Sequence, residues 1–197
     1  MIIIKSPREI ALMRQAGQLL AHVYEVVGPL VQPGVSTQDL ADICEKTIRA
    51  GGGVPAEKNF EGYPGAICAS VNEELVHGIP SKKRILHDGD IVSLDIVVEL
   101  NGYNADACRT YPVGICSEKV LRLVKVTEEC FWNGVKEVKE GAHLGDVSNA
   151  IQQTAESNGY SVPLDYTGHG IGREMHEDPY IPDYGTKGSG PILKEGM

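Results

Sequence analysis

The 197-residue sequence is 42% hydrophobic and 23% charged, which is typical of a globular chain long enough to bury a substantial core. The net charge of −9 argues against nucleic acid as a partner, because phosphate binding needs clustered lysine and arginine. Residues 1–5 are apolar but too few for a signal peptide or a membrane span. Five cysteines without CxxC spacing predict reduced thiols and therefore a cytoplasmic protein without a structural zinc site.

Two helices are predicted near the start of the chain. Ser6 fits the N-cap of the first, Pro7 its first helical position, and a glutamate at N3 completes a capping box. Apolar residues then recur at helical spacing up to Gly28. The second helix is predicted between a cap at Ser36 or Thr37 and the three glycines at 51–53. The stretch that follows alternates and carries turn residues, which indicates strands and loops.

A β-hairpin is predicted over residues 91–109. Two runs rich in β-branched residues flank Asn101-Gly102, the strongest short signal for a two-residue type I′ turn. If these two residues form the loop, the turn fixes the pairs that face each other: Leu100 and Tyr103, Val97 and Asp106, Asp95 and Cys108.

This register places two carboxylates on one face of the hairpin. Asp95 and Asp106 become diagonal neighbours with Cα atoms roughly 7–8 Å apart. Leu94, Ile96 and Val98 point the other way, towards a core. Neighbouring carboxylates repel each other unless a cation lies between them or one holds a proton. The hairpin therefore predicts half of a metal site, and a solvated acidic face is the alternative.

The order of elements is repeated from Ser117. A long helix carries the apolar residues Val120, Leu123, Val124, Phe131, Val135 and Val138, and a second helix follows Gly141. At an offset of 107 residues four identities line up: Val31 with Val138, Gly34 with Gly141, Asp39 with Asp146, and Gly52 with Gly159. We interpret this as an internal duplication, although chance agreement of two helix pairs also fits.

Histidines supply the second set of candidate residues. His169 lies between Gly168 and Gly170, and the missing Cβ atoms let other backbone and ligands approach it closely. Together with two carboxylates it would form a mixed nitrogen and oxygen site suited to manganese, iron, cobalt or zinc. His77 and His176 could each donate a hydrogen bond to a developing oxyanion, a role whose loss costs ~10²–10³ in rate.

Four motifs in the same order closely resemble the type I methionine aminopeptidases: HGIP at 77–80, DGDIVSLD at 88–95, the Asp106 region, and TGHGIGREMHEDP at 167–179. The resemblance implies an α/β (α+β) pita-bread fold, with duplicated helix–helix–strand units around an antiparallel sheet. It further implies that residues 1–197 form a single, incomplete catalytic domain whose pseudo-repeat halves are about 6–115 and 117–197. The C-terminal strands of the family fold are expected to be missing.

By the same resemblance, Asp95, Asp106 and His169 are three of five ligands of two divalent metal ions (cobalt, manganese, iron or zinc). His77 and His176 are the expected catalytic histidines, which contact substrate and stabilise the tetrahedral intermediate. The residues expected around the pocket for the N-terminal methionine side chain are Phe60, Tyr63, Cys68 and Met175, the last replacing a more usual aromatic residue.

The family's other two ligands are glutamates that follow a KEGM-like segment, here residues 194–197, so neither is expected in this chain. None of the nearby glutamates occupies a matching position, and all three are predicted to be surface residues: Glu174, Glu177 and Glu195.

The function implied by the resemblance is removal of the N-terminal methionine from nascent proteins and peptides, by a hydroxide that bridges two metal ions. Expected partners are peptides with N-terminal methionine and the ribosome, and the expected protein is a cytoplasmic monomer that binds neither membranes nor nucleic acid. Two alternatives remain: an inactive pita-bread protein that binds peptides, and an X-Pro aminopeptidase of the same fold, which usually carries an added N-terminal domain.

Overall fold

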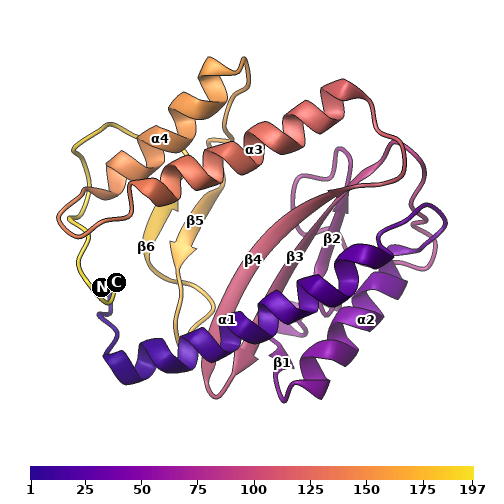
Figure 1. The fold of residues 1–197 in the computed structure, drawn as a ribbon. Helices are drawn as coiled ribbons and strands as arrows, with labels where there is room; N and C mark the ends of the chain where they lie inside the picture. Colours follow the sequence, from indigo (N-terminus) through magenta and orange to yellow (C-terminus); the bar gives the residue numbers. More distant parts are fainter. The chain divides into compact units, whose positions relative to one another are not determined.

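The computed structural model describes residues 1–197 and contains both helices and antiparallel strands, as predicted (Figure 1). The elements in chain order are α1 (Pro7–Val27), η1 (Gly28–Leu30), α2 (Thr37–Ala50), β1 (Val54–Pro55), η2 (Phe60–Gly62), β2 (Cys68–Val71), β3 (Ile91–Leu100), β4 (Tyr103–Pro112), α3 (Glu118–Lys136), α4 (Leu144–Ser157), β5 (Thr167–Gly170) and β6 (Glu177–Pro182). None of the helices combines the length and apolar character needed to cross a membrane.

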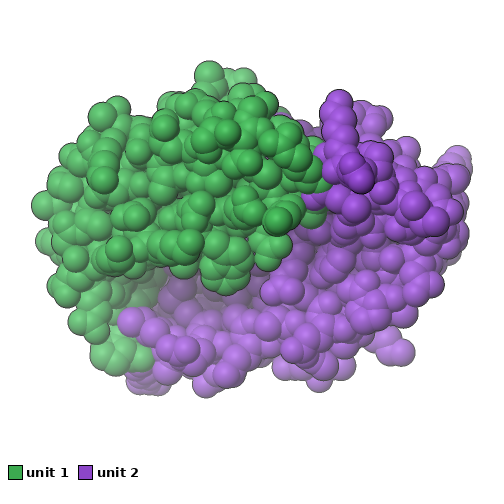
Figure 2. Space-filling view, turned by 45° about the horizontal axis from the view of Figure 1, so that its top comes forward, with its two compact units in different colours: residues 1–7, 122–170, 176–197 green, residues 8–121, 171–175 purple.

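The chain divides into two compact units, which Figure 2 colours separately. Unit 1 comprises residues 1–7, 122–170 and 176–197, and unit 2 comprises residues 8–121 and 171–175. The pseudo-repeat halves expected from the sequence, 6–115 and 117–197, stay a prediction.

Unit 2 is built on a four-stranded antiparallel sheet with β3 at its centre. Along one edge β3 pairs with β4, and along the other it pairs with β2 near its start and with β1 near its end. The long central strand therefore has neighbours on both sides, which leaves β4 and the short strands as the edges.

The predicted hairpin forms β3 and β4 in the predicted register. Leu100 pairs with Tyr103, and the intervening Asn101 and Gly102 have φ angles of 55° and 77°. Positive φ at both loop residues is what a type I′ turn requires, and asparagine and glycine adopt it at little cost. The turn chemistry alone therefore sets which side chains of β3 and β4 face each other.

One face of this sheet is covered by α1 and α2 (Figure 1). Leu94, Ile96 and Val98 of β3 are fully buried against apolar residues of the two helices, as the alternation predicted. Each such side chain contributes roughly 1.5–3 kcal/mol of hydrophobic stabilisation. Because side chains alternate, burying these residues directs Ser93, Asp95 and Val97 to the opposite face.

Unit 1 contains α4, the residues of α3 from Arg122 onward, and the β5–β6 pair. Its small core holds Val126 and Cys130 of α3 and Ala155 of α4. A Cβ at Gly134 would lie 2.8 Å from the Ile151 side chain, so this glycine lets α3 and α4 pack closely.

The apolar stripe expected on α3 is not the face that packs. The buried residues are Val126, Cys130 and Gly134, whereas Phe131 and Val138 of the expected stripe are exposed. Apolar residues occur on more than one side of this helix, and periodicity alone does not tell which side meets a neighbour.

Glu177 is not the surface residue that the sequence suggested. Its carboxylate lies 2.6 Å from the Lys5 ammonium, and both side chains are buried, with 7% and 6% of their surfaces exposed. The main-chain N–H of Lys5 also donates to the Gly196 carbonyl at 2.7 Å. Within unit 1, the first residues of the chain are thus held by β6 and the last residues.

Matching hydrogen bonds recur at the predicted offset of 107 residues. Ser36 forms an isolated bridge with Ile85, and His143 forms one with Ile192. Asp39 and Asp146 each close a capping box at the third position of their helices. Three main-chain hydrogen bonds also repeat: Gly34 to Leu86 as Gly141 to Leu193, Thr37 to Arg84 as Leu144 to Pro191, and Leu86 to Val35 as Leu193 to Ala142.

Candidate metal centre

The face of the β3–β4 hairpin away from the helices carries the two predicted carboxylates. Asp95 faces Cys108 across the ladder, and Asp106 faces Val97, so the two aspartates are diagonal neighbours as expected. Asp95 is half-buried and Asp106 is exposed. The register, and therefore this juxtaposition, follows from the Asn101-Gly102 turn.

A third carboxylate, which the sequence reasoning missed, enters the same group. Cys68 of β2 pairs directly with Asp95. The thiol of Cys68 donates to Oε1 of Glu57 at 3.1 Å, and the potential ligand atoms of Glu57, Cys68 and Asp95 all lie within 4.8 Å of one another. Glu57 has only 7% of its surface exposed, and Cys68 has 3%.

Burial governs the protonation of this group. It raises the pKa of the Glu57 carboxyl to about 8, opposed by the hydrogen bond from Cys68 and assisted by the charges of Asp95 and Asp106. Burial and the nearby Glu57 carboxylate also raise the pKa of the Cys68 thiol. Oε2 of Glu57 has no hydrogen-bond partner. Oε2 of Glu57 could therefore still accept a cation or a proton.

Only a weak signal in the sequence could have identified Glu57. The residues Gly53, Pro55 and Glu57 are alternately buried, which is the pattern of a strand that continues past β1. The N–H of Ala56 indeed donates to the Val97 carbonyl at 3.0 Å. Two residues of β1 are too few for this alternation to be recognised without the partner strand.

His169 and His176 lie together in unit 1. Their ring centroids are 4.4 Å apart with the planes at 73° to each other. Nδ1 of His169 lies 2.9 Å from the Gly170 carbonyl, which can only accept, so Nδ1 carries the proton. The neutral ring then presents Nε2 as its lone-pair donor, the form that binds metal ions.

The glycines beside His169 serve the β5–β6 pairing. A Cβ at Gly170 would lie 2.3 Å from the Asp178 carbonyl oxygen, which no side chain could tolerate. At Gly168 the corresponding distance, to the Ile181 carbonyl oxygen, is 3.2 Å. The close approach predicted for these glycines is therefore realised by the neighbouring strand backbone.

His77 lies in unit 2 on a strained and exposed turn with φ of 58°. The next residue, Gly78, is fixed against β2: its N–H donates to Ser70 Oγ at 3.0 Å, and its carbonyl accepts from the Ala69 N–H at 2.8 Å. The Tyr63 hydroxyl donates to the same carbonyl at 3.0 Å. These bonds hold the position of the turn that carries His77.

The four residues predicted for the substrate pocket all belong to unit 2. Cys68 and Met175 are buried, Tyr63 is half-buried, and Phe60 is exposed. The segment that carries Met175 is fastened to β4, because Asn104 donates from its main chain to the Gly172 carbonyl at 2.8 Å.

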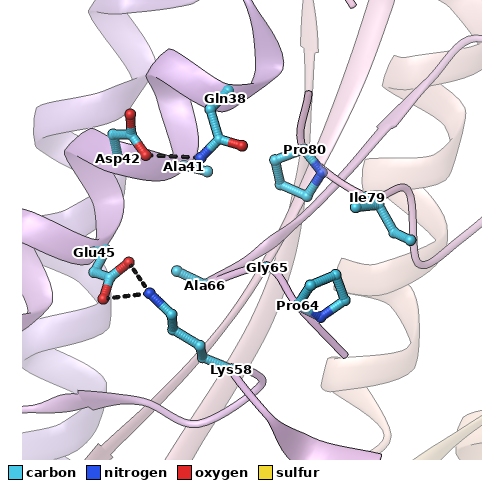
Figure 3. Close-up of a pocket in the computed structure, with 10 residues that line it drawn as sticks. All are labelled: Gln38, Ala41, Asp42, Glu45, Lys58, Pro64, Gly65, Ala66, Ile79 and Pro80. Atoms are coloured by element: carbon cyan, nitrogen blue, oxygen red, sulfur yellow. Dashed lines mark hydrogen bonds and ion pairs between the residues drawn. The ribbon is translucent and has the colours of Figure 1, made fainter. Parts of the chain in front are cut away.

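A separate small pocket of about 160 Å³ contains none of the predicted site residues (Figure 3). The Lys58 ammonium bonds both carboxylate oxygens of Glu45 at its edge, at 2.9 and 2.7 Å. It is lined by Gln38, Ala41, Asp42, Glu45, Lys58, Pro64, Gly65, Ala66, Ile79 and Pro80. Its one cation is therefore already paired with a carboxylate.

The donor chemistry of the predicted ligands fits a divalent transition metal. Asp95 and Asp106 present carboxylate oxygens on one hairpin face of unit 2, and within unit 1 His169 presents an imidazole nitrogen in the metal-binding tautomer. Carboxylate oxygen and imidazole nitrogen are both donor types that divalent transition metals accept.

Comparisons with known proteins agree with this chemistry. The profile of metallopeptidase family M24 matches residues 11–197. The methionine aminopeptidase of Clostridium acetobutylicum is 49% identical over 197 residues, which cover all of this chain and 79% of that protein. The crystal structure of the methionine aminopeptidase from Thermotoga maritima matches with a TM-score of 0.98 and 45% identity, over 100% of this chain and 79% of that one.

A prolidase from Pyrococcus furiosus shares the fold less closely. Its TM-score is 0.85 and its identity 26%, over 99% of this chain and 55% of the prolidase. The match to solved methionine aminopeptidases confirms the predicted pita-bread fold. The chain therefore belongs to metallopeptidase family M24 and, within it, to the methionine aminopeptidases.

Proposed function

We propose that this chain uses Asp95, Asp106 and His169 to hold two divalent metal ions for the hydrolytic removal of N-terminal methionine. The observation that carries the proposal is the register of β3 and β4, which sets the two aspartates side by side on one face. The tautomer of His169 supports its inclusion, as does its place in the TGHGIG motif shared with the family. Cobalt, manganese, iron or zinc would each suit these donors.

Bound metal ions would lower the pKa of a water molecule so that hydroxide is available near neutral pH. The side chains of the protein have two other tasks. His77 and His176 would donate hydrogen bonds to the carbonyl oxygen as it becomes an oxyanion, which stabilises the tetrahedral intermediate. The two carboxylates would together hold a cation, which neutralises their mutual repulsion.

Selectivity for methionine would come from the residues predicted around its side chain: Phe60, Tyr63, Cys68 and Met175. The buried, largely apolar character of Cys68 and Met175 suits a thioether. Tyr63 has a second task, because its hydroxyl holds the Gly78 carbonyl beside His77. Substrate binding and the position of a catalytic histidine would thus share one residue.

The partners we infer are peptides and nascent proteins with N-terminal methionine. By resemblance to the family, the protein would act as a cytoplasmic monomer near the ribosome. These assignments rest on the family and the motifs quoted above.

A substrate comparison tests the proposed reaction. The metal-loaded chain is incubated with Met-Ala-Ser and with a peptide that begins with an X-Pro bond. We expect free methionine from the first peptide and no cleavage of the second. Cleavage of the X-Pro bond would favour a prolidase-like activity, whereas binding of Met-Ala-Ser without cleavage would favour the inactive peptide-binding alternative.

A further inference from the structure

A buried ion pair in unit 1 joins the first residues of the chain to the residue that follows His176. The Lys5 ammonium donates to Oε2 of Glu177 at 2.6 Å, and both side chains are more than nine-tenths buried. Lysine and glutamate are almost never so buried unless they are paired. A buried pair is weak evidence for stability, because the cost of removing two charges from water can cancel their attraction. Its place in the fold indicates a different role.

Glu177 lies where β6 loses its regular pairing with β5. His169 pairs with Tyr180, but the next residue of β5, Gly170, pairs with Glu177, so the register shifts between the two pairs. Such a shift interrupts the ladder of main-chain hydrogen bonds. Strand pairing alone therefore fixes the start of β6, and His176 directly before it, less firmly than a residue inside a regular strand.

The ring of His176 depends on the backbone at this point. Its centroid lies 4.4 Å from that of His169, with the ring planes at 73°. His169 directly precedes Gly170, the partner of Glu177 in the ladder. The two histidines thus flank the same pair of residues, one on each strand. A displacement of Glu177 would carry His176 with it and change the contact between the rings.

Lys5 is a fixed anchor because the other end of the chain holds its backbone. The Lys5 N–H donates to the Gly196 carbonyl at 2.7 Å. A Cβ at Gly196 would lie 2.6 Å from the Lys5 carbonyl oxygen, so only glycine permits this approach. Figure 1 shows the two ends of the chain side by side. The ammonium therefore extends from a backbone that is held on both sides of the contact.

We propose that Lys5 and Glu177 are positioning residues, whose ion pair holds the start of β6 so that the His176 ring stays against His169. The inference rests on the proposed function, in which His176 stabilises the oxyanion. A charge-assisted hydrogen bond is short and strong, and here it compensates for the interrupted strand pairing. The first residues of the chain thereby support the active site without touching the substrate.

NMR of the full, metal-free chain tests the positioning directly. The rings of His169 and His176 are close enough to give a nuclear Overhauser effect (NOE) between their protons in the wild type. The test variant combines Lys5→Met with Glu177→Gln, which keeps the length of both side chains and leaves no unpaired buried charge. We expect this double variant to fold, as judged by circular dichroism, and to lose the NOE between the rings.

Two further variants separate positioning from folding. Lys5→Arg keeps the buried positive charge and should keep the NOE. Asp178→Asn is the matched control, because it removes the adjacent ion pair between the N-terminal ammonium and the Asp178 carboxylate, which is exposed. Exposed ion pairs contribute little. Asp178→Asn should therefore keep both the NOE and the activity of the wild type.

Kinetics with Met-Ala-Ser connect the ion pair to the proposed reaction. A displaced His176 would stabilise the transition state less while substrate binding persists, so the double variant should lose at least about tenfold in kcat with little change in KM. Lys5→Arg should keep most of the wild-type kcat. Absence of turnover in the wild type would count against the proposed function alone, because the NOE comparison needs neither metal nor substrate.

Three results would overturn the proposal. They are no NOE between the two rings in the wild type, an undiminished NOE in the folded double variant, and an NOE lost in Asp178→Asn. If the double variant does not fold, Glu177→Gln alone takes its place. A wild-type NOE in folded Glu177→Gln would then show that the ion pair does not position His176.

Discussion

Cys68 and Asp95 stand directly opposite each other in the β2–β3 ladder, and their shared face is the acidic side of the sheet. The other side of β3 packs against α1 and α2. Because side chains alternate along the strand, its apolar core residues and Asp95 lie on opposite faces of the sheet. Glu57 joins Cys68 and Asp95 from the chain that follows β1. This face therefore combines one thiol and two carboxylates from three segments of unit 2.

Truncating the core side of β3 should destabilise the protein strongly. Ile96 is fully buried between the sheet and the helices, so Ile96→Ala should lower the free energy of unfolding by about 2–5 kcal/mol, and Ile96→Val by about 0.5–1.5 kcal/mol. Urea denaturation measures both changes. Ile115→Ala, at a residue 88% exposed, is the control and should change stability by less than about 0.5 kcal/mol. Equal effects at the two positions would contradict the packing described here.

Tyr63 should matter for the turn that carries His77. Tyr63→Phe removes the hydroxyl that bonds the Gly78 carbonyl, a bond whose loss typically costs about 0.5–1.5 kcal/mol. We expect faster amide hydrogen exchange around residues 76–79 and a lower turnover number, with metal affinity unchanged. Tyr180→Phe, at an exposed tyrosine, is the matched control. Exchange in Tyr63→Phe as slow as in the wild type would show that this hydroxyl does not hold the turn.

The two glycines around His169 should respond differently to an added methyl group. Gly170→Ala would place a Cβ 2.3 Å from the Asp178 carbonyl oxygen, so β5 and β6 should separate locally and metal affinity should fall. Gly168→Ala meets its nearest atom at 3.2 Å and should be the milder change. Thermal unfolding and metal titration of both variants measure the contrast. A larger loss in Gly168→Ala would be inconsistent with the observed strand pairing.

The capping box of α2 should make stability depend on pH in the acid range. Hydrogen bonds from the hydroxyl and main-chain N–H of Ser36 lower the pKa of Asp39 below its ordinary value of 3.8. A lowered folded-state pKa means that the contribution of Asp39 is complete well above pH 3.8 and is lost as the pH falls through the folded value.

Melting temperatures of the wild type and Asp39→Ala, compared from about pH 6 to about pH 3, should therefore converge as the pH falls. Asp39→Asn keeps an acceptor that does not titrate, so its difference from Asp39→Ala should be independent of pH. A difference between wild type and Asp39→Ala that grows towards low pH would reverse the expected sign.

The parts of the fold that local sequence controls were predictable. Asn101 and Gly102 adopt the positive φ angles of their turn and thereby fix every pair in the β3–β4 ladder, including the position of Asp106. Ser36, one of the two predicted candidates, caps α2. In each case the residues that decide the structure lie within a few positions of one another.

The contacts that were missed all depend on distant segments. Glu57 meets Cys68 because β1 and β2 pair with the same strand, a fact that no local pattern contains. Lys5 and Glu177 are 172 positions apart, so the sequence around neither residue could predict their buried ion pair. The face of α3 that packs is the one on which Gly134 leaves room for the Ile151 side chain of α4.

The most direct test of the proposed metal centre compares Asp106→Asn with His77→Ala by calorimetric titration with Mn²⁺ or Co²⁺. Asp106→Asn removes a proposed ligand and should weaken metal binding by at least about tenfold, whereas His77→Ala removes only a substrate contact and should leave it unchanged. Both variants should lose release of methionine from Met-Ala-Ser. Equal metal affinity in the two variants would contradict the assignment of Asp106 as a ligand and, with it, the central role of the β3–β4 face.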